Sequence, residues 1–343
     1  MNVRQIVFED LNKVVVRAAD DPLQPGLGEV VLASAYLGIC GSDLHVLQGK
    51  HPWTKPPVVT GHELAAVVEK IGPDVHDLLP GDHVVLNPLF ACGTCRRCRM
   101  GSFNTCDAGR VTGYIPPQQT PGRPARPGVP GVGQTKLVMS ARQLHRLPPD
   151  MPLDRACLAE PMAVGVHASS LFDDLEDVLV IGGGTIGLCV LLALRARRAG
   201  RVTVIEPIAY KRDLAKRLGA AEALSPEQAQ SAPRYTACFD CVGGQQTFDL
   251  ASGSALSGGC VIVVGISPGR ISVPMPRMQR FEIRMQGSGL YLGKDIDRAI
   301  ELIASGKVNV TPLISMVRPL DEAPEAYAAA QTPASVKVLV RMS

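Results

Sequence analysis

A cysteine, a histidine and a glutamate in the first half of the chain are of the types that bind a catalytic zinc ion. Cys40 and His62 stand at the two ends of one segment, and their side chains meet if the residues between them fold back. Thiolate and imidazole suit zinc, and a site with three protein ligands keeps a fourth position open for chemistry. Glu160-Pro161 offers a carboxylate that can complete the set. Because a lone Cys and a lone His are usually structural, this pattern needs support from other features.

A second group of thiols predicts a structural zinc site. Its members, at spacings of three, three and eight, are Cys92, Cys95, Cys98 and Cys106. Four thiolates can converge on one tetrahedral ion and leave no position open. A disulfide framework is the first alternative, and a nucleic-acid zinc module, suggested by the arginines around the cluster, is the second. Ten cysteines without a secretory signal indicate a reducing compartment, and the paired histidines of a zinc finger are missing, so structural zinc is favoured.

Composition points to an ordinary globular protein of two domains. The chain has 343 residues, of which 46% are hydrophobic and 20% charged, and the net charge is +3. This length favours two domains, and the small charge argues against nucleic acid or an anionic membrane as partner. The apolar run 178–194 contains several glycines and is short for a membrane span. The first residues lack the apolar core of a signal peptide, so we expect a cytoplasmic location.

The middle of the chain carries a dinucleotide-binding pattern. An apolar strand, 177–181, leads into Gly182-Gly183-Gly184-Thr185-Ile186-Gly187, then an apolar helix, a strand at 202–205 and Glu206 at its end. In such a unit the glycines allow a tight turn, close approach of a pyrophosphate and tight helix packing. The helix N-terminus, with Thr185 and Ile186 in its first turn, offers N–H groups to the phosphates. The Gly-x-Gly-x-x-Gly pattern is specific here because its whole context is present.

The acid at the strand end favours NAD over NADP. Glu206 would accept hydrogen bonds from ribose hydroxyls and repel a 2′-phosphate, whereas Lys211 and Arg212 could hold that phosphate. The unit then repeats, with strands at 236–240 and 261–264 and a helix at 246–256, which predicts a right-handed parallel sheet. Further cofactor contacts are expected at Arg212 and, after these strands, at Val242, Gly265 and Ile266. Cys238 and Cys241 form a Cys-x-x-Cys that we interpret as buried packing thiols.

The remaining segments predict a second, β-rich domain. Residues 1–90 contain short β-branched runs separated by Pro and Gly turns, which is typical of a small barrel or sandwich. Residues 107–134 are rich in Pro, Gly and Arg and predict a surface loop without an assigned function. Helices are expected at 294–306 and 321–331 and a closing strand at 336–340, and this tail is expected to rejoin the first domain.

The chain resembles the zinc-dependent medium-chain alcohol dehydrogenases over essentially its whole length, with the motifs in the order found in that family. The resemblance rests on the Cys40–His45 and Gly61–Glu63 runs, the four-cysteine lobe, Glu160-Pro161 and the nucleotide pattern. The run 160–168 is most similar to the sorbitol (polyol) dehydrogenase branch. The fold that it implies is α/β: a GroES-like catalytic domain at 1–152, with the zinc lobe at about 88–110, a Rossmann NAD-binding domain at 153–289, and a C-terminal return at 290–343.

The resemblance also implies residue roles and two zinc ions per chain, one catalytic and one structural. Cys40 and His62 would be catalytic zinc ligands, with Glu63 and Glu160 at or near the metal, one direct and the other through water or on opening of the site. Ser42 would pass the substrate proton and His45 would lie further along the relay. Asp43 would orient His62. Cys157 is a possible substitute ligand that we expect to pack instead.

One position that bears on the substrate departs from the polyol branch, and a second residue has two possible roles. An Arg that contacts sugar hydroxyls in that branch is replaced by Leu290 in the run Gly287–Tyr291, which favours a less polar alcohol. Trp53, which stands in a segment that usually faces the substrate, can contact the substrate or pack. The Glu-Pro run argues against a threonine dehydrogenase.

The predicted function is hydride transfer between a secondary alcohol or polyol, or the matching ketone, and NAD(H). Zinc lowers the pKa of a bound hydroxyl, and a serine–histidine relay carries the proton away. The partners expected are this small substrate and further copies of the chain, as a homodimer or homotetramer, with neither nucleic acid nor membrane. Alternatives are a zinc-free NAD(P)H-dependent reductase of activated double bonds and a non-catalytic dinucleotide-binding protein. Replacing Cys40 by Ser should remove the catalytic zinc and turnover while preserving NAD binding.

Overall fold

The computed structural model describes residues 3–21, 24–51, 53–114, 129–231, 234–266 and 269–343. Its chain divides into a first unit, Met1–Glu160 with Ile314–Ser343, and a second unit, Pro161–Leu313. The sequence placed these divisions at 152 and 289. Among the described residues, no helix is both long and apolar enough to cross a membrane.

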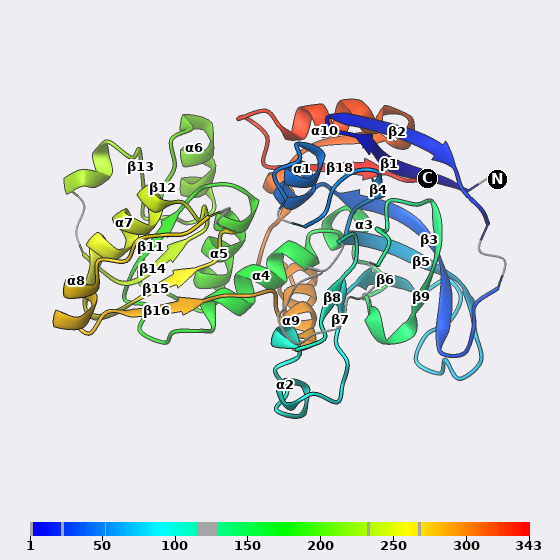
Figure 1. The fold of residues 1–343 in the computed structure, drawn as a ribbon, viewed down its shortest axis with the longest axis horizontal. Coiled ribbons are helices and arrows are strands. Elements are labelled where there is room, and N and C mark those ends of the chain that lie inside the picture. Colours follow the sequence, from blue (N-terminus) through cyan, green and yellow to red (C-terminus); the bar gives the residue numbers. More distant parts are fainter. Residues whose placement is uncertain (1–2, 22–23, 52, 115–128, 232–233, 267–268) are drawn as a thin grey trace. The chain divides into compact units, whose positions relative to one another are not determined.

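The first unit is built mainly from antiparallel strands in two larger sheets (Figure 1). One sheet has the order β2-β1-β4, and the other the order β10-β6-β5-β3-β18-β17, with β9 also pairing with β3. A short ribbon, β7-β8, lies beside the cysteine lobe. The bounds of these strands are β1 Arg4–Asp10, β2 Lys13–Ala18, β3 Glu29–Gly38, β4 Val58–Val59, β5 Glu63–Ile71, β6 His83–Leu86, β7 Leu89–Phe90, β8 Arg110–Val111, β9 Lys136–Ser140, β10 Leu144–Arg146, β17 Ile314–Pro319 and β18 Lys337–Arg341.

Successive side chains of each strand point to opposite faces of the sheet, which explains why one face of the sheet is buried. Along β5 and β6, apolar residues such as Leu64, Val68 and Val84 turn inward and join one core. The helices of this unit are short: α1 Gly41–Leu47, α2 Arg96–Arg99, α3 Leu153–Ala156 and α10 Ala323–Ala330. Short 3₁₀ turns at Phe103–Thr105, Ala141–Gln143 and Leu320–Glu322 connect them. The β-rich first domain predicted from the sequence is confirmed.

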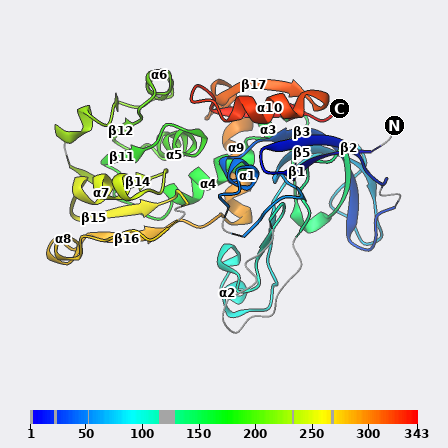
Figure 2. The same ribbon diagram turned by 45° about the horizontal axis from the view of Figure 1, so that its top comes forward.

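The last residues of the chain complete the first unit. Strand β18 pairs with β3 in antiparallel fashion and with β17 in parallel, so it lies inside the sheet. Helix α10 lies beside β17 (Figure 2) and also packs against β2 and β18. Tyr327 meets the Phe8 ring edge-on, with ring centroids 5.0 Å apart. The expected return of the tail is therefore present, although it begins at residue 314.

The second unit is a six-stranded parallel sheet with the order β13-β12-β11-β14-β15-β16 (Figure 1). Every neighbouring pair is parallel, as the buried apolar strands predict. The strands are β11 Asp177–Ile181, β12 Arg201–Ile205, β13 Glu222–Leu224, β14 Tyr235–Asp240, β15 Ala255–Val263 and β16 Arg284–Gly287. The helices are α4 Ala159–Ser169, which begins at the end of the first unit, α5 Thr185–Ala196, α6 Ala209–Arg217, α7 Gln245–Ser254, α8 Met275–Arg280 and α9 Gly293–Ala304.

Two segments differ from the sequence prediction. The helix expected at 246–256 ends at Ser254, and β15 begins at Ala255, because this residue is already buried and pairs with Tyr235. Helix α9 lies in the second unit, where His167 Nδ1 of α4 is 2.9 Å from Asp295 Oδ2. This contact joins α9 to α4 within the second unit.

The described flanks of the segment 107–134 differ from the predicted surface loop. Residues 115–128 lie outside the described part of the chain. The flanks are built into the first unit: Thr112 bridges to Val129, and Val132 is fully buried. The N–H of Gly131 donates to the Val59 carbonyl at 2.9 Å. For these flanks, the prediction of a solvated loop was wrong, because the segment's backbone hydrogen-bonds with the chain around Thr60.

Candidate functional site

The turn before helix α1 holds the cysteine of the candidate catalytic centre. Cys40 is the N-cap residue of α1, with extended backbone, and its N–H donates to Asp43 Oδ2 at 3.0 Å. Asp43 is fully buried, and its other oxygen, Oδ1, accepts from Thr60 Oγ1 at 2.9 Å. A buried carboxylate needs such donors. Asp43 therefore ties the Cys40 turn to the strand end that carries His62.

His62 has a buried ring with one nitrogen already engaged. Its Nδ1 lies 3.3 Å from the Tyr114 hydroxyl and 3.6 Å from Asp43 Oδ1, which leaves Nε2 as the nitrogen free to bind a metal. Burial alone would lower the pKa of His62, but the anionic groups around it, above all Asp43, raise that pKa well above its usual value. Glu160 and Cys40 contribute to the same shift. Surroundings that stabilise an imidazolium ion also favour a bound cation.

Glu63 forms an ion pair inside the first unit. Both of its carboxylate oxygens lie 2.7 Å from Lys337 Nζ, which also donates to the Ile39 carbonyl at 2.9 Å. The two side chains are 1% and 2% exposed. Burial tends to lower the pKa of Lys337, but the Glu63 carboxylate outweighs it and the pKa is raised. The charge next to His62 is thus already balanced by a cation from the last strand.

The donor atoms of Cys40, His62 and Glu63 lie within 4.8 Å of one another. Sulfur, imidazole nitrogen and carboxylate oxygen are zinc ligands, so these residues fit the ion that the sequence predicted. Glu160 is also buried, at the start of α4, and its charge acts on His62. The structure therefore brings Cys40, His62 and Glu63 together in the first unit, and Glu160 lies near enough for its charge to act on His62.

The proposed relay residues lie on α1. Ser42 is partly buried and its Oγ is 2.6 Å from the Tyr114 hydroxyl, which donates to it. His45 is exposed in the last turn of the helix. Partial burial, and then the charge of Lys50, lower the pKa of His45, so its ring is neutral near pH 7 and can accept a proton.

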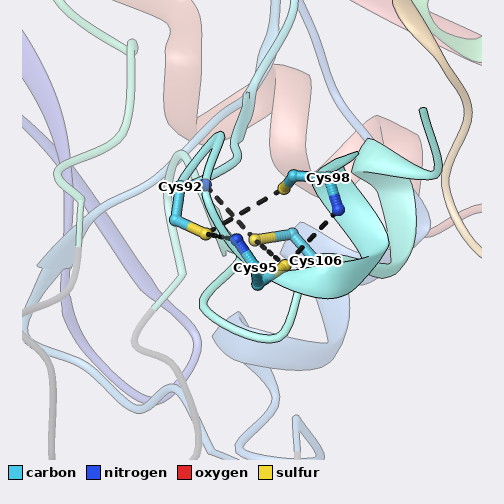
Figure 3. Close-up of side chains that lie close together, drawn as sticks. All are labelled: Cys92, Cys95, Cys98 and Cys106. Atoms are coloured by element: carbon cyan, nitrogen blue, oxygen red, sulfur yellow. Dashed lines mark hydrogen bonds between the residues drawn. The ribbon is translucent and has the colours of Figure 1, made fainter. Parts of the chain in front are cut away.

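The four cysteines of the lobe converge as predicted (Figure 3). Cys92 Sγ is 4.0 Å from Cys98 Sγ, and Cys95 Sγ is 3.9 Å from Cys106 Sγ. Zn–S bonds of about 2.3 Å in a tetrahedron place sulfurs about 3.8 Å apart, so the group has the size of a closed zinc site. Backbone N–H groups point at the sulfurs, as from Cys95 to Cys92 at 3.3 Å. Such donors stabilise thiolates.

The glycine-rich turn of the second unit has the geometry that a dinucleotide needs. Gly182 has φ of +99°, which only glycine adopts readily. A Cβ at Gly187 would lie 1.8 Å from the Gly182 carbonyl oxygen, so helix and strand pack too closely for any side chain there. At Gly184, the N-cap of α5, a Cβ would meet nothing within 4 Å, which leaves space for a phosphate at the helix N-terminus with Thr185 and Ile186.

Glu206 is fixed at the end of β12. Its Oε2 accepts from the Gly183 N–H at 2.7 Å and its Oε1 from the Ile208 N–H at 2.9 Å. Arg212 donates from Nη1 to the Glu206 backbone carbonyl at 2.8 Å and to that of Pro207. The carboxylate thus lies directly beside the phosphate-binding turn, whereas the guanidinium is held by carbonyl groups.

The remaining predicted cofactor residues lie at the carboxyl ends of two neighbouring strands. Val242 and Ile266 are 52% and 66% exposed, and Gly265 packs against the backbone of Val242. Of the other thiols, Cys157 and Cys238 are buried, and burial raises the pKa of each. Burial likewise raises the pKa of Cys241. The interpretation of these cysteines as packing residues agrees with the structure.

Two residues of the centre were missed by sequence reasoning. Tyr114 lies in the segment to which no function was assigned, yet its hydroxyl contacts Ser42 and His62. Lys337 lies in a strand that was assigned from its apolar pattern alone, and its charge pairs with Glu63. A basic residue opening an otherwise apolar strand was the only available signal for Lys337, and Tyr114 had none.

Comparison with known proteins yields two family models and many relatives. The model described as an alcohol dehydrogenase GroES-like domain matches residues 26–149, and that described as a zinc-binding dehydrogenase matches residues 185–305. A sorbitol dehydrogenase of Arabidopsis thaliana is 32% identical over 313 residues, covering 85% of this chain and 82% of the relative.

Solved structures with the same fold include the alcohol dehydrogenase TADH from Thermus sp. ATN1. It is 29% identical, with a TM-score of 0.85, and the match covers 98% of this chain and 99% of that one. A zinc-binding dehydrogenase from Sinorhizobium meliloti 1021, bound to NADP, is 27% identical with a TM-score of 0.88 and 99% coverage of both chains.

Proposed function

Because this chain belongs to the zinc-dependent medium-chain alcohol and polyol dehydrogenases, we propose that it interconverts a secondary alcohol or diol and the matching ketone with NAD(H). The family makes the chain an oxidoreductase of alcohols with a nicotinamide cofactor. The choice of NAD over NADP, the presence of two zinc ions and the class of alcohol are our proposals.

The observation that supports most of this proposal is the cluster of Cys40, His62 and Glu63 with an engaged His62 Nδ1. We infer that Cys40, His62 Nε2 and Glu160 are the protein ligands, because the carboxylate of Glu63 is neutralised by Lys337. Glu63 would then lie beside the ligands without binding the metal itself. When bound there, zinc supplies a Lewis acid that lowers the pKa of the substrate hydroxyl.

The residues of the chain then have the following tasks. Asp43 fixes the Cys40 turn through the Cys40 N–H. Ser42 presents its oxygen to the substrate hydroxyl and accepts that proton while it releases its own hydroxyl proton, which the neutral ring of His45 passes toward solvent. Oxidation of the alcohol thus delivers a hydride to the nicotinamide and a proton to water.

Support for NAD comes from the placement of Glu206. Its carboxylate is held by two backbone N–H groups at the turn, where it would accept bonds from ribose hydroxyls and repel a 2′-phosphate. Arg212, whose guanidinium is bound to two carbonyls, is not aimed at that phosphate. The relative from S. meliloti holds NADP, so the two cofactors must be compared directly.

Leu290 is the residue from which we infer the polarity of the substrate. An apolar residue stands where the polyol branch has Arg, and this favours a secondary alcohol or vicinal diol over a hexitol. A test measures NAD and NADP reduction over a panel of secondary alcohols, diols and polyols, together with the zinc content per chain. The proposal requires two zinc ions per chain, a preference for NAD and faster oxidation of the less polar substrates. Full activity in protein that holds only one zinc ion, or none, would contradict it.

A further inference from the structure

The hydroxyl of Tyr114 lies between a candidate metal ligand and the serine of the relay. It is 3.3 Å from His62 Nδ1 and 2.6 Å from Ser42 Oγ, and 3.5 Å from Asp43 Oδ1. Tyr114 follows β8 in a turn, and the ring of His51 stacks on it with centroids 5.0 Å apart and planes at 12°. The face of the ring is therefore held, which fixes the position of the hydroxyl.

The donors and acceptors available determine which group donates in the contact between His62 Nδ1 and the Tyr114 hydroxyl. If His62 binds the metal through Nε2, Nδ1 carries the proton and donates. Of the two acceptors described beside Nδ1, the Tyr114 oxygen at 3.3 Å is nearer than Asp43 Oδ1 at 3.6 Å. Tyr114 in turn donates to Ser42 Oγ. One lone pair of Ser42 is then occupied, and its own hydrogen is left to point elsewhere.

We propose that Tyr114 is a positioning residue that orients the Ser42 hydroxyl toward the substrate oxygen and secures the His62 tautomer. This inference depends on the proposed function. The chain His62 Nδ1–H to Tyr114 O–H to Ser42 O–H runs in one direction, and each bond in such a chain polarises the next. In the direction of ketone reduction, Ser42 thereby presents a donor to the ketone oxygen, which is the reverse of the proton uptake proposed for alcohol oxidation. Tyr114 itself exchanges no proton with the substrate.

Two neighbouring aromatic residues do not have this role. His51 accepts from the Thr54 N–H at Nδ1, 3.0 Å away, and contacts Tyr114 through its face. Trp53 meets His51 edge-on with centroids 5.7 Å apart and is 55% exposed. These rings support the tyrosine, and only its hydroxyl reaches Ser42 and His62. Removing that hydroxyl while keeping the ring therefore isolates the proposed role.

The experiment compares Tyr114→Phe, Ser42→Ala and the double variant in metal-loaded enzyme with NAD and the best alcohol of the panel. We expect Tyr114→Phe to lower kcat about 10-fold with KM for NAD unchanged. In the Ser42→Ala background the same change should alter kcat by less than about twofold, because Tyr114 acts through Ser42. Equal losses in both backgrounds, or wild-type kcat for Tyr114→Phe, would overturn the proposal.

A second readout does not depend on turnover. Tyr114→Phe should speed the chelator-driven loss of the catalytic metal about threefold or more, because His62 Nδ1–H loses its nearest acceptor, while the cysteine lobe keeps its metal. The control is Tyr327→Phe, which removes another buried hydroxyl of the same unit that has no hydrogen-bond partner among the described residues. This control should match the wild type in both assays.

Failure of this inference can be told apart from failure of the proposed function. A wild-type protein that binds no metal at Cys40 and His62, or oxidises no alcohol, refutes the function itself. An active, metal-loaded wild type whose Tyr114→Phe variant releases metal and turns over at the wild-type rate refutes only the role of Tyr114.

Discussion

Replacing Lys337 by Met should destabilise the first unit strongly, since it leaves the Glu63 carboxylate buried without its counter-ion. Lys337 Nζ lies 2.7 Å from both Glu63 oxygens, and the pair is 1–2% exposed. Breaking such a pair from one side typically costs about 3–5 kcal/mol. With a urea m-value of about 2 kcal/mol per M, the unfolding midpoint should fall by about 1.5–2.5 M.

The assay follows urea unfolding of the metal-loaded protein by the fluorescence of Trp53. This residue is the only tryptophan of the chain and belongs to the first unit, so the signal reports on the unit that contains the ion pair. Because the pKa of Lys337 is raised above its usual value of about 10.4, the pair is fully formed at lower pH and lost only in stronger alkali. The ion pair should therefore remain formed in the wild type between about pH 6 and 9.

Two further variants test the reasoning. Lys136→Met breaks a more exposed pair with Glu69, at 2.9 Å, and should cost no more than about 1 kcal/mol. The double variant Glu63→Gln with Lys337→Met should recover most of the lost stability, because no buried charge remains. The reasoning is refuted if Lys337→Met is no more destabilising than Lys136→Met, or if the double variant is the least stable of the three.

Two other predictions concern the cofactor and the cysteine lobe. Glu206→Ala should raise the Kd for NADH about 10-fold or more, whereas the Kd for NADPH should stay the same or fall. Fluorescence titration measures both constants. An equal rise in both would contradict the role of Glu206. In protein stripped of metal, iodoacetamide should alkylate Cys92 well before Cys98, since the N–H groups of Thr94 and Cys95 lower the pKa of Cys92 to about 6, whereas burial raises that of Cys98 to about 12. Because Cys92 is mainly a thiolate above its pKa, its alkylation rate should rise through about pH 6 and then level off. Mass spectrometry of samples alkylated at different pH values measures this rate. Added zinc should block the alkylation of Cys92.

The parts of the fold that the sequence predicts well are those set by local chemistry. Glycines at 182 and 187, followed by an apolar helix and an acid, leave few alternatives to a nucleotide-binding unit, and the observed sheet order agrees. The four cysteines likewise converge because their short spacings restrict the loop between them. Strand ends and helix ends were less accurate, as at Ala255, because burial there depends on partners that are distant in sequence.

Long-range polar contacts could not be predicted. Lys337 follows a turn near the end of the chain, and the apolar strand that it opens does not indicate that its ammonium group enters the core to meet Glu63. Tyr114 belongs to a stretch whose composition is that of a loop, and only the return of the backbone at Val129–Gly133 places it beside Ser42. Composition and periodicity describe neighbours along the chain, and both contacts join segments that the tertiary fold alone brings together.

The position of β18 inside the sheet has a consequence for how the protein is made. Glu63 and Lys337 are separated by 274 residues, and the whole second unit is synthesised between them. At about 5–20 residues per second, a ribosome needs roughly 14–55 s to cover that distance. During this interval, the nascent catalytic domain carries an uncompensated carboxylate and an open edge at β3. The second unit can therefore mature first, and the first unit, which holds the candidate metal ligands, closes only when β18 has left the ribosome.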